Sequence, residues 1–158
     1  MVDRDLDAMA DLLGDPRVMR YYPRPKTRAE ARRWIDWNRA NYRDLGFGLW
    51  IIETLDGQFV GDCGLTIQEV EGDRDVEVGY HVRTDFQNQG LATEAALAAK
   101  GLAITRDVRR LIAIINPLNK PSQRVAEKIG LSYERTVSRP DGDQRIYAAA
   151  LTAPRTIP

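Results

Sequence analysis

The stretch FQNQGLATEA, Phe86 to Ala95, combines side-chain amides, one glycine and small residues where a loop leads into a predicted helix. The first turn of a helix carries unpaired N–H groups and a partial positive charge. No acidic residue stands in this stretch before Glu94, and Gly90 has no side chain to block a close approach. The backbone from Gln87 to Thr93 therefore suits a diphosphate. The stretch alone is equally compatible with a plain helix start, because it has neither a Gly-Lys-Ser/Thr loop nor a GxGxxG fingerprint.

Hydrophobic periodicity defines the elements that must position this stretch. A strand–helix–strand unit from Val76 to Ile115 should place two parallel strands in one sheet with a right-handed crossover. Hairpins add antiparallel strands, so we expect an α/β fold with a mixed sheet and helices on its faces. Residues 69–75 are expected to form a polar turn. Helices are expected near 6–13, 27–45, 90–107 and 119–129, and strands near 48–54, 58–67, 76–82, 109–116, 133–137 and 144–151.

Composition narrows the class of protein. The chain of 158 residues is expected to form one domain over 1–158. Its 23 basic and 23 acidic residues argue against a broad nucleic-acid surface. A single cysteine, Cys63, and a single histidine, His81, make a disulfide and a metal site improbable. No apolar run is long enough to span a bilayer, and the start is charged. We therefore expect a cytoplasmic protein without nucleic acid, membrane or metal partners.

Two segments of the chain resemble the GNAT acetyltransferase superfamily. The first resembles its acyl-CoA pyrophosphate motif, Q/R-x-x-G-x-G/A, at Gln87, Gly90 and Ala92. The second, INPLNKPSQRVAEKIGLSYER, resembles the N-x-x-S…E-K-x-G-F/L segment of the ribosomal-protein and amino-acid N-acetyltransferase (RimJ/RimL-like) branch. Its matching positions are Asn119, Ser122, Glu127, Lys128, Gly130 and Leu131. The stretches EVGYHV, GDCGL and GDPRVMRYYP also resemble that branch, so the resemblance covers nearly the whole chain in order.

The resemblance implies a mixed, mostly antiparallel sheet with helices on both faces and a splayed parallel strand pair. It also implies acetyl-CoA as co-substrate. Backbone amides would hold the diphosphate, the edge near Tyr80 to Val82 would pair with the pantetheine, and Tyr21 and Tyr22 would line the acceptor side. The residues expected to contact the cofactor are Tyr80, Val82, Gln87, Asn88, Gln89, Gly90, Leu91, Ala92, Thr93, Asn119 and Ser122.

Direct acyl transfer requires a neutral amine and a stabilised thiolate, so a base and a hydrogen-bond donor are needed. Strand alternation places Glu77, Gly79 and His81 on one face. If that face looks into the cleft, Glu77 is the expected base or holds a water, and His81 could assist it. Ser122 is the expected donor to the thiolate. The alternatives are a solvated Glu77, a structural or substrate-lining His81, and a Ser122 that only stabilises its helix.

The sequence departs from other family members in two places. Another branch carries a glutamate on the strand before the asparagine helix and a tyrosine inside that helix, where this chain has Ile114 and Ala126. Family members also usually open with a strand before the first helix, and here only Met1 to Arg4 precede it. Either the first strand is missing or the sheet edge is covered in another way, and an exposed edge favours a homodimer.

The leading hypothesis is an acetyl-CoA-dependent N-acetyltransferase that acts on a primary amine. The amine could be a protein N-terminus, an amino acid or a small amine. The main alternative is a non-catalytic GNAT-fold domain that binds acyl-CoA as a sensor or assembly module. A nucleotide-binding enzyme is a weaker third reading, because the loop lacks a phosphate-binding lysine and a carboxylate for a metal.

Overall fold

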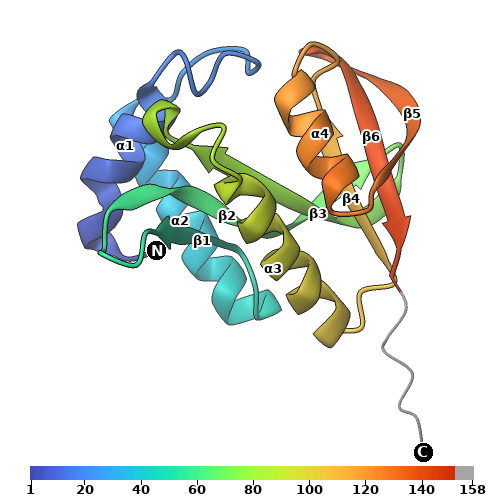
Figure 1. Ribbon diagram of the computed structural model, residues 1–158, viewed down its shortest axis with the longest axis horizontal. Coiled ribbons are helices and arrows are strands. Elements are labelled where there is room, and N and C mark those ends of the chain that lie inside the picture. Colours follow the sequence, from blue (N-terminus) through green and yellow to red (C-terminus); the bar gives the residue numbers. More distant parts are fainter. Residues whose placement is uncertain (152–158) are drawn as a thin grey trace, which may run out of the picture.

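The computed structural model describes residues 1–151, and the order of its elements agrees with the predicted order (Figure 1). The last residues of the predicted 1–158 domain lie outside the described range. Within that range, no helix has the length and apolar character needed to cross a membrane. The helices are η1 (Asp3–Asp5), α1 (Leu6–Gly14), α2 (Arg28–Leu45), η2 (Thr84–Phe86), α3 (Leu91–Thr105) and α4 (Lys120–Lys128). The strands are β1 (Leu49–Glu53), β2 (Phe59–Val70), β3 (Asp73–Val82), β4 (Arg110–Ile115), β5 (Ser132–Arg139) and β6 (Gly142–Ala150).

The six strands form one sheet in the order β1-β2-β3-β4-β6-β5. Every neighbouring pair is antiparallel except β3 and β4, which are parallel. The parallel pairing covers only Val76 opposite Leu111 and Glu77 opposite Ile112, and the two strands then diverge (Figure 1). The predicted mixed sheet with a splayed parallel pair is therefore confirmed. The divergence leaves the edge of β3 toward its carboxyl end without a strand partner.

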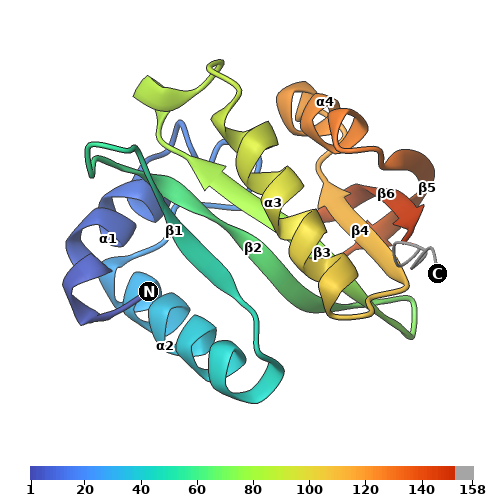
Figure 2. The ribbon, with the colours of Figure 1, turned by 60° about the horizontal axis from the view of Figure 1, so that its bottom comes forward.

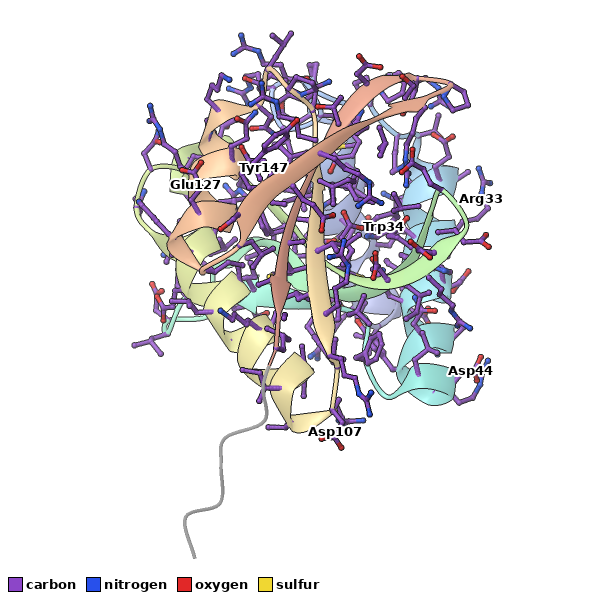
Figure 3. The ribbon with its side chains drawn as sticks, turned by 90° about the vertical axis from the view of Figure 1, so that its right-hand side faces the viewer. Arg33, Trp34, Asp44, Asp107, Glu127 and Tyr147 are labelled. Atoms are coloured by element: carbon purple, nitrogen blue, oxygen red, sulfur yellow. The ribbon has the colours of Figure 1, made fainter. Side chains whose placement is uncertain are left out.

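The two faces of the sheet are covered by different helices, as predicted (Figure 2). Asp62 of β2 lies opposite His81 of β3, and this face receives α2, whose Trp34 donates a hydrogen bond to Asp62. Figure 3 shows Trp34 toward the middle of the molecule and Arg33 at its outer edge. Helix α3 packs on the opposite face, where Val78 is buried.

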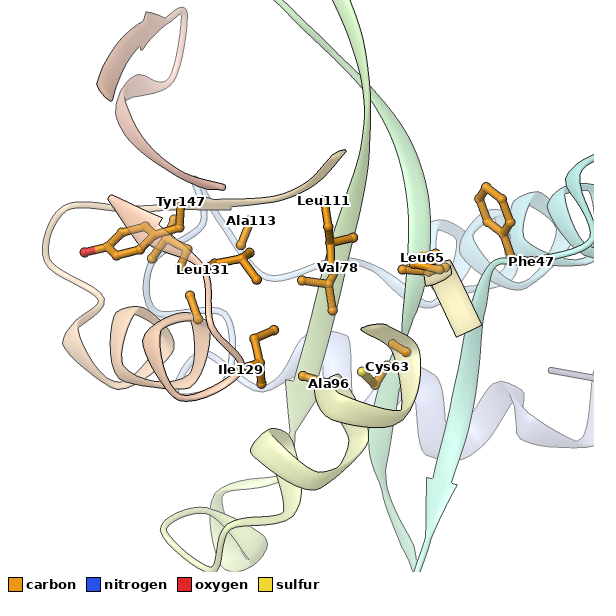
Figure 4. Close-up of a cluster of buried hydrophobic side chains, with 14 residues drawn as sticks. Phe47, Cys63, Leu65, Val78, Ala96, Leu111, Ala113, Ile129, Leu131 and Tyr147 are labelled. Atoms are coloured by element: carbon orange, nitrogen blue, oxygen red, sulfur yellow. The ribbon is translucent and has the colours of Figure 1, made fainter. Parts of the chain in front are cut away.

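The largest hydrophobic cluster lies between that opposite face and helices α3 and α4 (Figure 4). Alanines of α3, among them Ala96, allow the helix to come close to Val78 and Leu65. Cys63 belongs to this cluster, and burial raises the pKa of its thiol to about 12. The packing fixes α3, and with it the helix start described below, against β2 and β3.

The β2–β3 hairpin is longer than the sequence indicates. The prediction of a polar turn over 69–75 was wrong, because β2 runs to Val70, β3 starts at Asp73, and only Glu71 and Gly72 turn. Both turn residues have left-handed backbones, with φ of 53° and 91°. Ion pairs from β4 and β5 anchor the polar end of this hairpin. Arg135 pairs with Glu71 at 3.1 Å, and Arg110 of β4 pairs with Asp75 at 3.1 Å.

A hydrogen-bonded cap fixes the loop between α1 and α2. The backbone N–H of Glu30 donates to Thr27 Oγ1 at 3.2 Å, and the N–H of Thr27 donates to the Glu30 carboxylate at 2.7 Å, which together form a capping box. The Arg24 guanidinium also binds this carboxylate and is the main reason that the pKa of Glu30 is lowered. Met19 is buried under the loop. The tyrosine pair at Tyr21 and Tyr22 is thereby held against the sheet.

Strand β1 forms one edge of the sheet, and within residues 1–151 no strand precedes α1. The start of the chain is anchored on α2, where Arg32 and Arg39 both pair with Asp3, at 2.7 and 3.0 Å. The expectation of a homodimer stays a prediction.

Candidate functional site

Two cavities meet where β3 and β4 diverge. The first, the sheet cavity, has a volume of about 270 Å³ and is lined by Glu77, Ile114 and Trp34 among others. The second, the α3 cavity, has a volume of about 460 Å³ and is lined by the start of α3 and by one side of α4. Residues that line both cavities are Tyr21, Tyr22, Tyr80, His81, Asn119 and Ser122. The two cavities therefore adjoin at the gap between the strands, and we call the place where they share these residues the passage.

The start of α3 offers a group of free backbone donors to the α3 cavity. The amides from Gly90 to Thr93 have no hydrogen-bond partner within the described chain. Gly90 has a left-handed backbone with φ of 80°, and a Cβ added there would meet no atom within 4 Å. The predicted space for an anion at this helix start is present. Its size and its free donors fit a diphosphate.

The glutamines of this loop hold its shape. Gln87 Nε2 donates to the carbonyl oxygen of Val82 at 2.9 Å, and Gln89 Nε2 donates to that of Asp85 at 3.0 Å. These bonds stabilise a loop in which Asn88 has φ of 60°. The side-chain amides of Gln87 and Gln89 therefore stabilise the loop conformation. Asn88 and the residues from Gly90 to Thr93 line the α3 cavity.

Basic side chains on the rim of the α3 cavity were missed by the sequence analysis. Arg20, Arg124 and Lys128 line the cavity, and no ion pair joins them to carboxylates among residues 1–151. Arg20 belongs to the α1–α2 loop, whereas Arg124 and Lys128 belong to α4. Because these segments are far apart in the sequence, the sequence alone does not indicate that the three side chains lie together. Their charges make this cavity electropositive, as a site for phosphate groups requires.

Residues of β3 and α4 come together at the passage between the cavities. The Tyr80 hydroxyl donates to the carbonyl oxygen of Ser122 at 3.0 Å and so ties β3 to α4 across the gap. Asn119 is the N-cap of α4, and its Oδ1 accepts from the backbone N–H of Ser122 at 3.2 Å. The Asn119 Nδ2 and the Ser122 Oγ have no hydrogen-bond partner among the described residues and lie where both cavities reach them.

Glu77 lies on the wall of the sheet cavity where the parallel pairing ends. Its carboxylate accepts hydrogen bonds from the Ile114 backbone N–H at 3.3 Å and from Thr66 Oγ1 at 3.2 Å. Burial raises the pKa of Glu77 to about 7, although these hydrogen bonds and Arg139 act in the opposite direction. A carboxyl group with this pKa can both take and release a proton near neutral pH.

His81 lies on the same face and is held between two partners. Its Nδ1 is 2.8 Å from Asp62 Oδ1, and its Nε2 is 2.9 Å from the Tyr22 hydroxyl. Asp62 has no exposed surface, and its second oxygen accepts from Trp34 Nε1 at 3.0 Å. The sequence analysis assigned no role to Asp62, although it stands in the quoted motif GDCGL.

The tryptophans of α2 form another part of the site that the sequence analysis missed. Trp34 and Trp37 both line the sheet cavity. Their rings are 5.3 Å apart, and Trp37 remains 39% exposed. Across the cavity, Asn116 Nδ2 is 3.5 Å from the carbonyl oxygen of Tyr21 and links that loop to the end of β4. The sheet cavity is thus aromatic on one side and polar on the other.

The histidine, cysteine and carboxylate side chains of residues 1–151 form no group of three or more that could hold a metal ion.

Comparison with known proteins places this geometry in a family. The family model described as an acetyltransferase (GNAT) domain matches residues 1–132. The uncharacterized protein YkkB of Bacillus subtilis (strain 168) is 39% identical over 142 residues, which are 88% of this chain and 83% of that protein.

Solved structures share the fold. An acetyltransferase from Agrobacterium tumefaciens str. C58 superposes with a TM-score of 0.83 at 24% identity, over 96% of this chain and 88% of that one. RimL, a ribosomal L7/L12 α-N-protein acetyltransferase solved in complex with coenzyme A, gives a TM-score of 0.78 at 18% identity, over 98% and 93% of the two chains. With a family model that matches most of its length, this chain belongs to the GNAT acetyltransferase family.

Proposed function

We propose that this chain transfers an acetyl group from acetyl-CoA directly to a primary amine. The observation that carries the proposal is the meeting of the two cavities at the divergence of β3 and β4. One cavity presents free amides and unpaired cations, and the other presents a carboxyl group with a pKa near neutrality. Acyl transfer from a CoA thioester requires a site that binds phosphates and, next to it, a site that deprotonates an amine. The α3 cavity would serve as the first site and the sheet cavity as the second. The acceptor would be a protein N-terminus, an amino acid or a small amine.

The fit of acetyl-CoA is supported by the free donors of the α3 cavity. The amides from Gly90 to Thr93 would bind the diphosphate, and Arg20, Arg124 and Lys128 would neutralise its charge and that of the remaining phosphate. The free edge of β3 would pair with the amides of the pantetheine arm, and Asn119 Nδ2 would donate to the same arm. RimL, which shares the fold, was solved with coenzyme A.

The chemistry follows from the groups at the passage. The amine nitrogen attacks the thioester carbonyl carbon, a C–N bond forms, and the C–S bond breaks. Glu77 would take a proton from the amine, and its pKa of about 7 suits that task. The Ser122 hydroxyl, without a hydrogen-bond partner among the described residues, would donate to the leaving thiolate. Holding both substrates in one passage would supply much of the rate.

The test is release of free thiol from acetyl-CoA with the purified full chain across a panel of amines, peptides and amino acids. Thiol release that depends on one class of amine is the expected result. Calorimetric titration with acetyl-CoA runs beside it. Tight binding without thiol release for any acceptor would overturn the enzymatic proposal in favour of the binding-module alternative. Stronger binding of ATP than of acetyl-CoA would favour the nucleotide-binding reading instead.

A further inference from the structure

The hydrogen bonds between Asp62, His81 and Tyr22 have a direction. A carboxylate only accepts hydrogen bonds, and Asp62 already accepts one from Trp34 at its second oxygen. The hydrogen between Asp62 and His81 at 2.8 Å therefore belongs to His81 Nδ1. In a neutral imidazole the other nitrogen, Nε2, is then an acceptor. The Tyr22 hydroxyl, 2.9 Å away, must donate to it.

This direction leaves the Tyr22 oxygen able to accept a hydrogen bond, because its one partner among the described residues is His81. Tyr22 and His81 both line the two cavities, so their hydrogen bond lies where the cavities adjoin. Burial raises the pKa of the Tyr22 hydroxyl well above its ordinary value, and the charges of Glu77 and Asp62 add to this effect. The hydroxyl thus keeps a proton that it can pass to His81. Tyr22 reaches His81 from a loop 59 residues away in the sequence.

We propose that Tyr22, His81 and Asp62 form a relay that removes a proton from the acceptor nitrogen. The acceptor N–H donates to the Tyr22 oxygen, while the Tyr22 proton moves to His81 Nε2. His81 becomes an imidazolium whose positive charge is balanced by the buried carboxylate of Asp62. Tyr22 is the group that contacts the substrate, and His81 and Asp62 act through it. This inference rests on the proposed acetyl transfer and adds a second proton acceptor to that site.

A relay in addition to Glu77 is consistent with the proton balance of the reaction. An ammonium group must lose one proton before it attacks and a second before the product is a neutral amide. One of these can return to the thiolate as it leaves, and the other is released to solvent. Glu77 and the Tyr22 relay lie on the wall of the same cavity, so each could take one proton. No further reactant is required.

The groups that face His81 agree with this assignment. Trp34 of α2 packs edge-on against the imidazole with ring centroids 5.9 Å apart, and the Tyr22 ring is 5.4 Å away. The charged groups around it are Asp62 on β2, which bonds to it, and Glu77 on β3, while Lys26 Nζ lies 5.3 Å from the ring of Trp34. Among the described residues, Asp62 is the charged group that bonds directly to the imidazole. Because a carboxylate only accepts, Asp62 fixes which nitrogen carries the hydrogen.

The experiment uses the fact that the chain contains a single histidine. Nitrogen NMR of the full chain, labelled with ¹⁵N-histidine, reports directly which ring nitrogen of His81 carries the hydrogen. We expect the hydrogen on Nδ1 in the wild type. In Asp62→Asn the oxygen of the amide must still face Trp34, so its NH₂ group faces His81. The hydrogen should then move to Nε2, and Tyr22 can no longer donate to it.

Kinetics with the best amine of the panel test the consequence. Asp62→Asn and Tyr22→Phe should each lower kcat by roughly 100-fold, as for loss of a positioned proton acceptor, with KM for acetyl-CoA unchanged. Tyr42→Phe is the matched control. It removes a partly buried hydroxyl of α2 that lies outside both cavities, and it should leave kcat unchanged.

A wild-type hydrogen on Nε2 would overturn the relay, and so would a Tyr22→Phe variant that keeps wild-type kcat. If only the relay is wrong, the wild type still releases thiol with an amine. If the proposed function is wrong, the wild type releases no thiol with any amine, so the two failures can be distinguished. A folded Asp62→Asn chain is recognised by near-UV circular dichroism and a cooperative thermal transition like those of the wild type, so loss of the fold cannot be mistaken for loss of the relay.

Discussion

The α3 cavity and the sheet cavity are built in different ways. The α3 cavity depends on one continuous stretch of backbone, from Gly90 to Thr93, with basic side chains around it. The sheet cavity depends on side chains from the α1–α2 loop, α2, β2, β3, β4 and β5. A backbone site needs only small residues and a helix start. A cavity made of side chains can change what it binds by single substitutions while the backbone site stays intact.

The largest expected effect separates chemistry from binding. Glu77→Gln should lower kcat by about 100- to 10,000-fold, because the proposed general base is lost, and should leave the Kd for acetyl-CoA unchanged. Wild-type activity should fall as pH decreases through about 7, since the base must be ionised, and the variant should lose this dependence. Steady-state kinetics between pH 5 and 9 check both results.

The control variant is Glu127→Gln, which removes an exposed carboxylate of α4 outside both cavities and should leave kcat unchanged. If Glu77→Gln kept wild-type kcat, Glu77 would not be the base.

The next effect concerns the backbone site alone. Gly90→Gln should weaken acetyl-CoA binding about 100-fold or more, because its side chain enters the space where the diphosphate would lie. Gly57→Gln is a matched control in the β1–β2 turn, since Gly57 also has a left-handed backbone, with φ of 84°, and open space around it. Both variants carry the same backbone strain, of about 1 kcal/mol. Calorimetric titration with acetyl-CoA compares them, and equal binding by the two would contradict a diphosphate site at Gly90.

A smaller effect concerns stability and pH. The pKa of Glu77 is raised in the folded chain from an ordinary value of 4.5 to about 7, so its contribution favours folding fully below about 4.5. That contribution is lost as pH rises through about 7. Glu77→Gln should therefore raise the thermal midpoint relative to the wild type by a few degrees at pH 9 and not at pH 4. Thermal unfolding at the two pH values checks this. An equal shift at both would show that Glu77 titrates normally.

The smallest effect separates two tasks of one residue. Asn119→Ala should cost about 1 kcal/mol of stability, because α4 loses its side-chain cap, and should weaken acetyl-CoA binding. Asn119→Asp keeps an oxygen for the cap but replaces the Nδ2 donor with a negatively charged oxygen, so it should keep stability while binding is still weakened. Denaturant unfolding and calorimetry measure the two quantities. Wild-type binding by Asn119→Asp would mean that Asn119 acts on the helix alone.

Much of the fold and of the α3 cavity could be predicted because their signals are local. The capping box at Thr27 and Glu30, the proline in the first turn of α4 and the apolar run of β4 each mark an element within a few residues. The motif at Gln87 and Gly90 marks a helix start that the structure leaves open to a ligand. Strand alternation correctly placed Glu77 and His81 on one face, and both line the sheet cavity. Their roles in catalysis stay predictions.

The remaining features depend on contacts between distant segments. Asp62 meets His81 only through the register of β2 against β3, and Tyr22 meets it only through the fold of a loop. The polar hairpin end was missed because its ion-pair partners, Arg110 and Arg135, arrive from β4 and β5. No pattern within a single segment could reveal these contacts.

The buried thiol of Cys63 has a practical consequence for enzymology. It is the only thiol of the chain, it is packed between the sheet and α3, and its pKa of about 12 keeps it neutral under assay conditions. Colorimetric disulfide reagents react with thiolates. The folded protein should therefore give almost no background with such a reagent, even at the high enzyme concentrations that a slow, unidentified substrate demands. If the protein unfolds during the assay, Cys63 becomes exposed and reacts with the reagent. The absorbance of a sample without acetyl-CoA therefore measures the unfolded fraction in each acceptor screen.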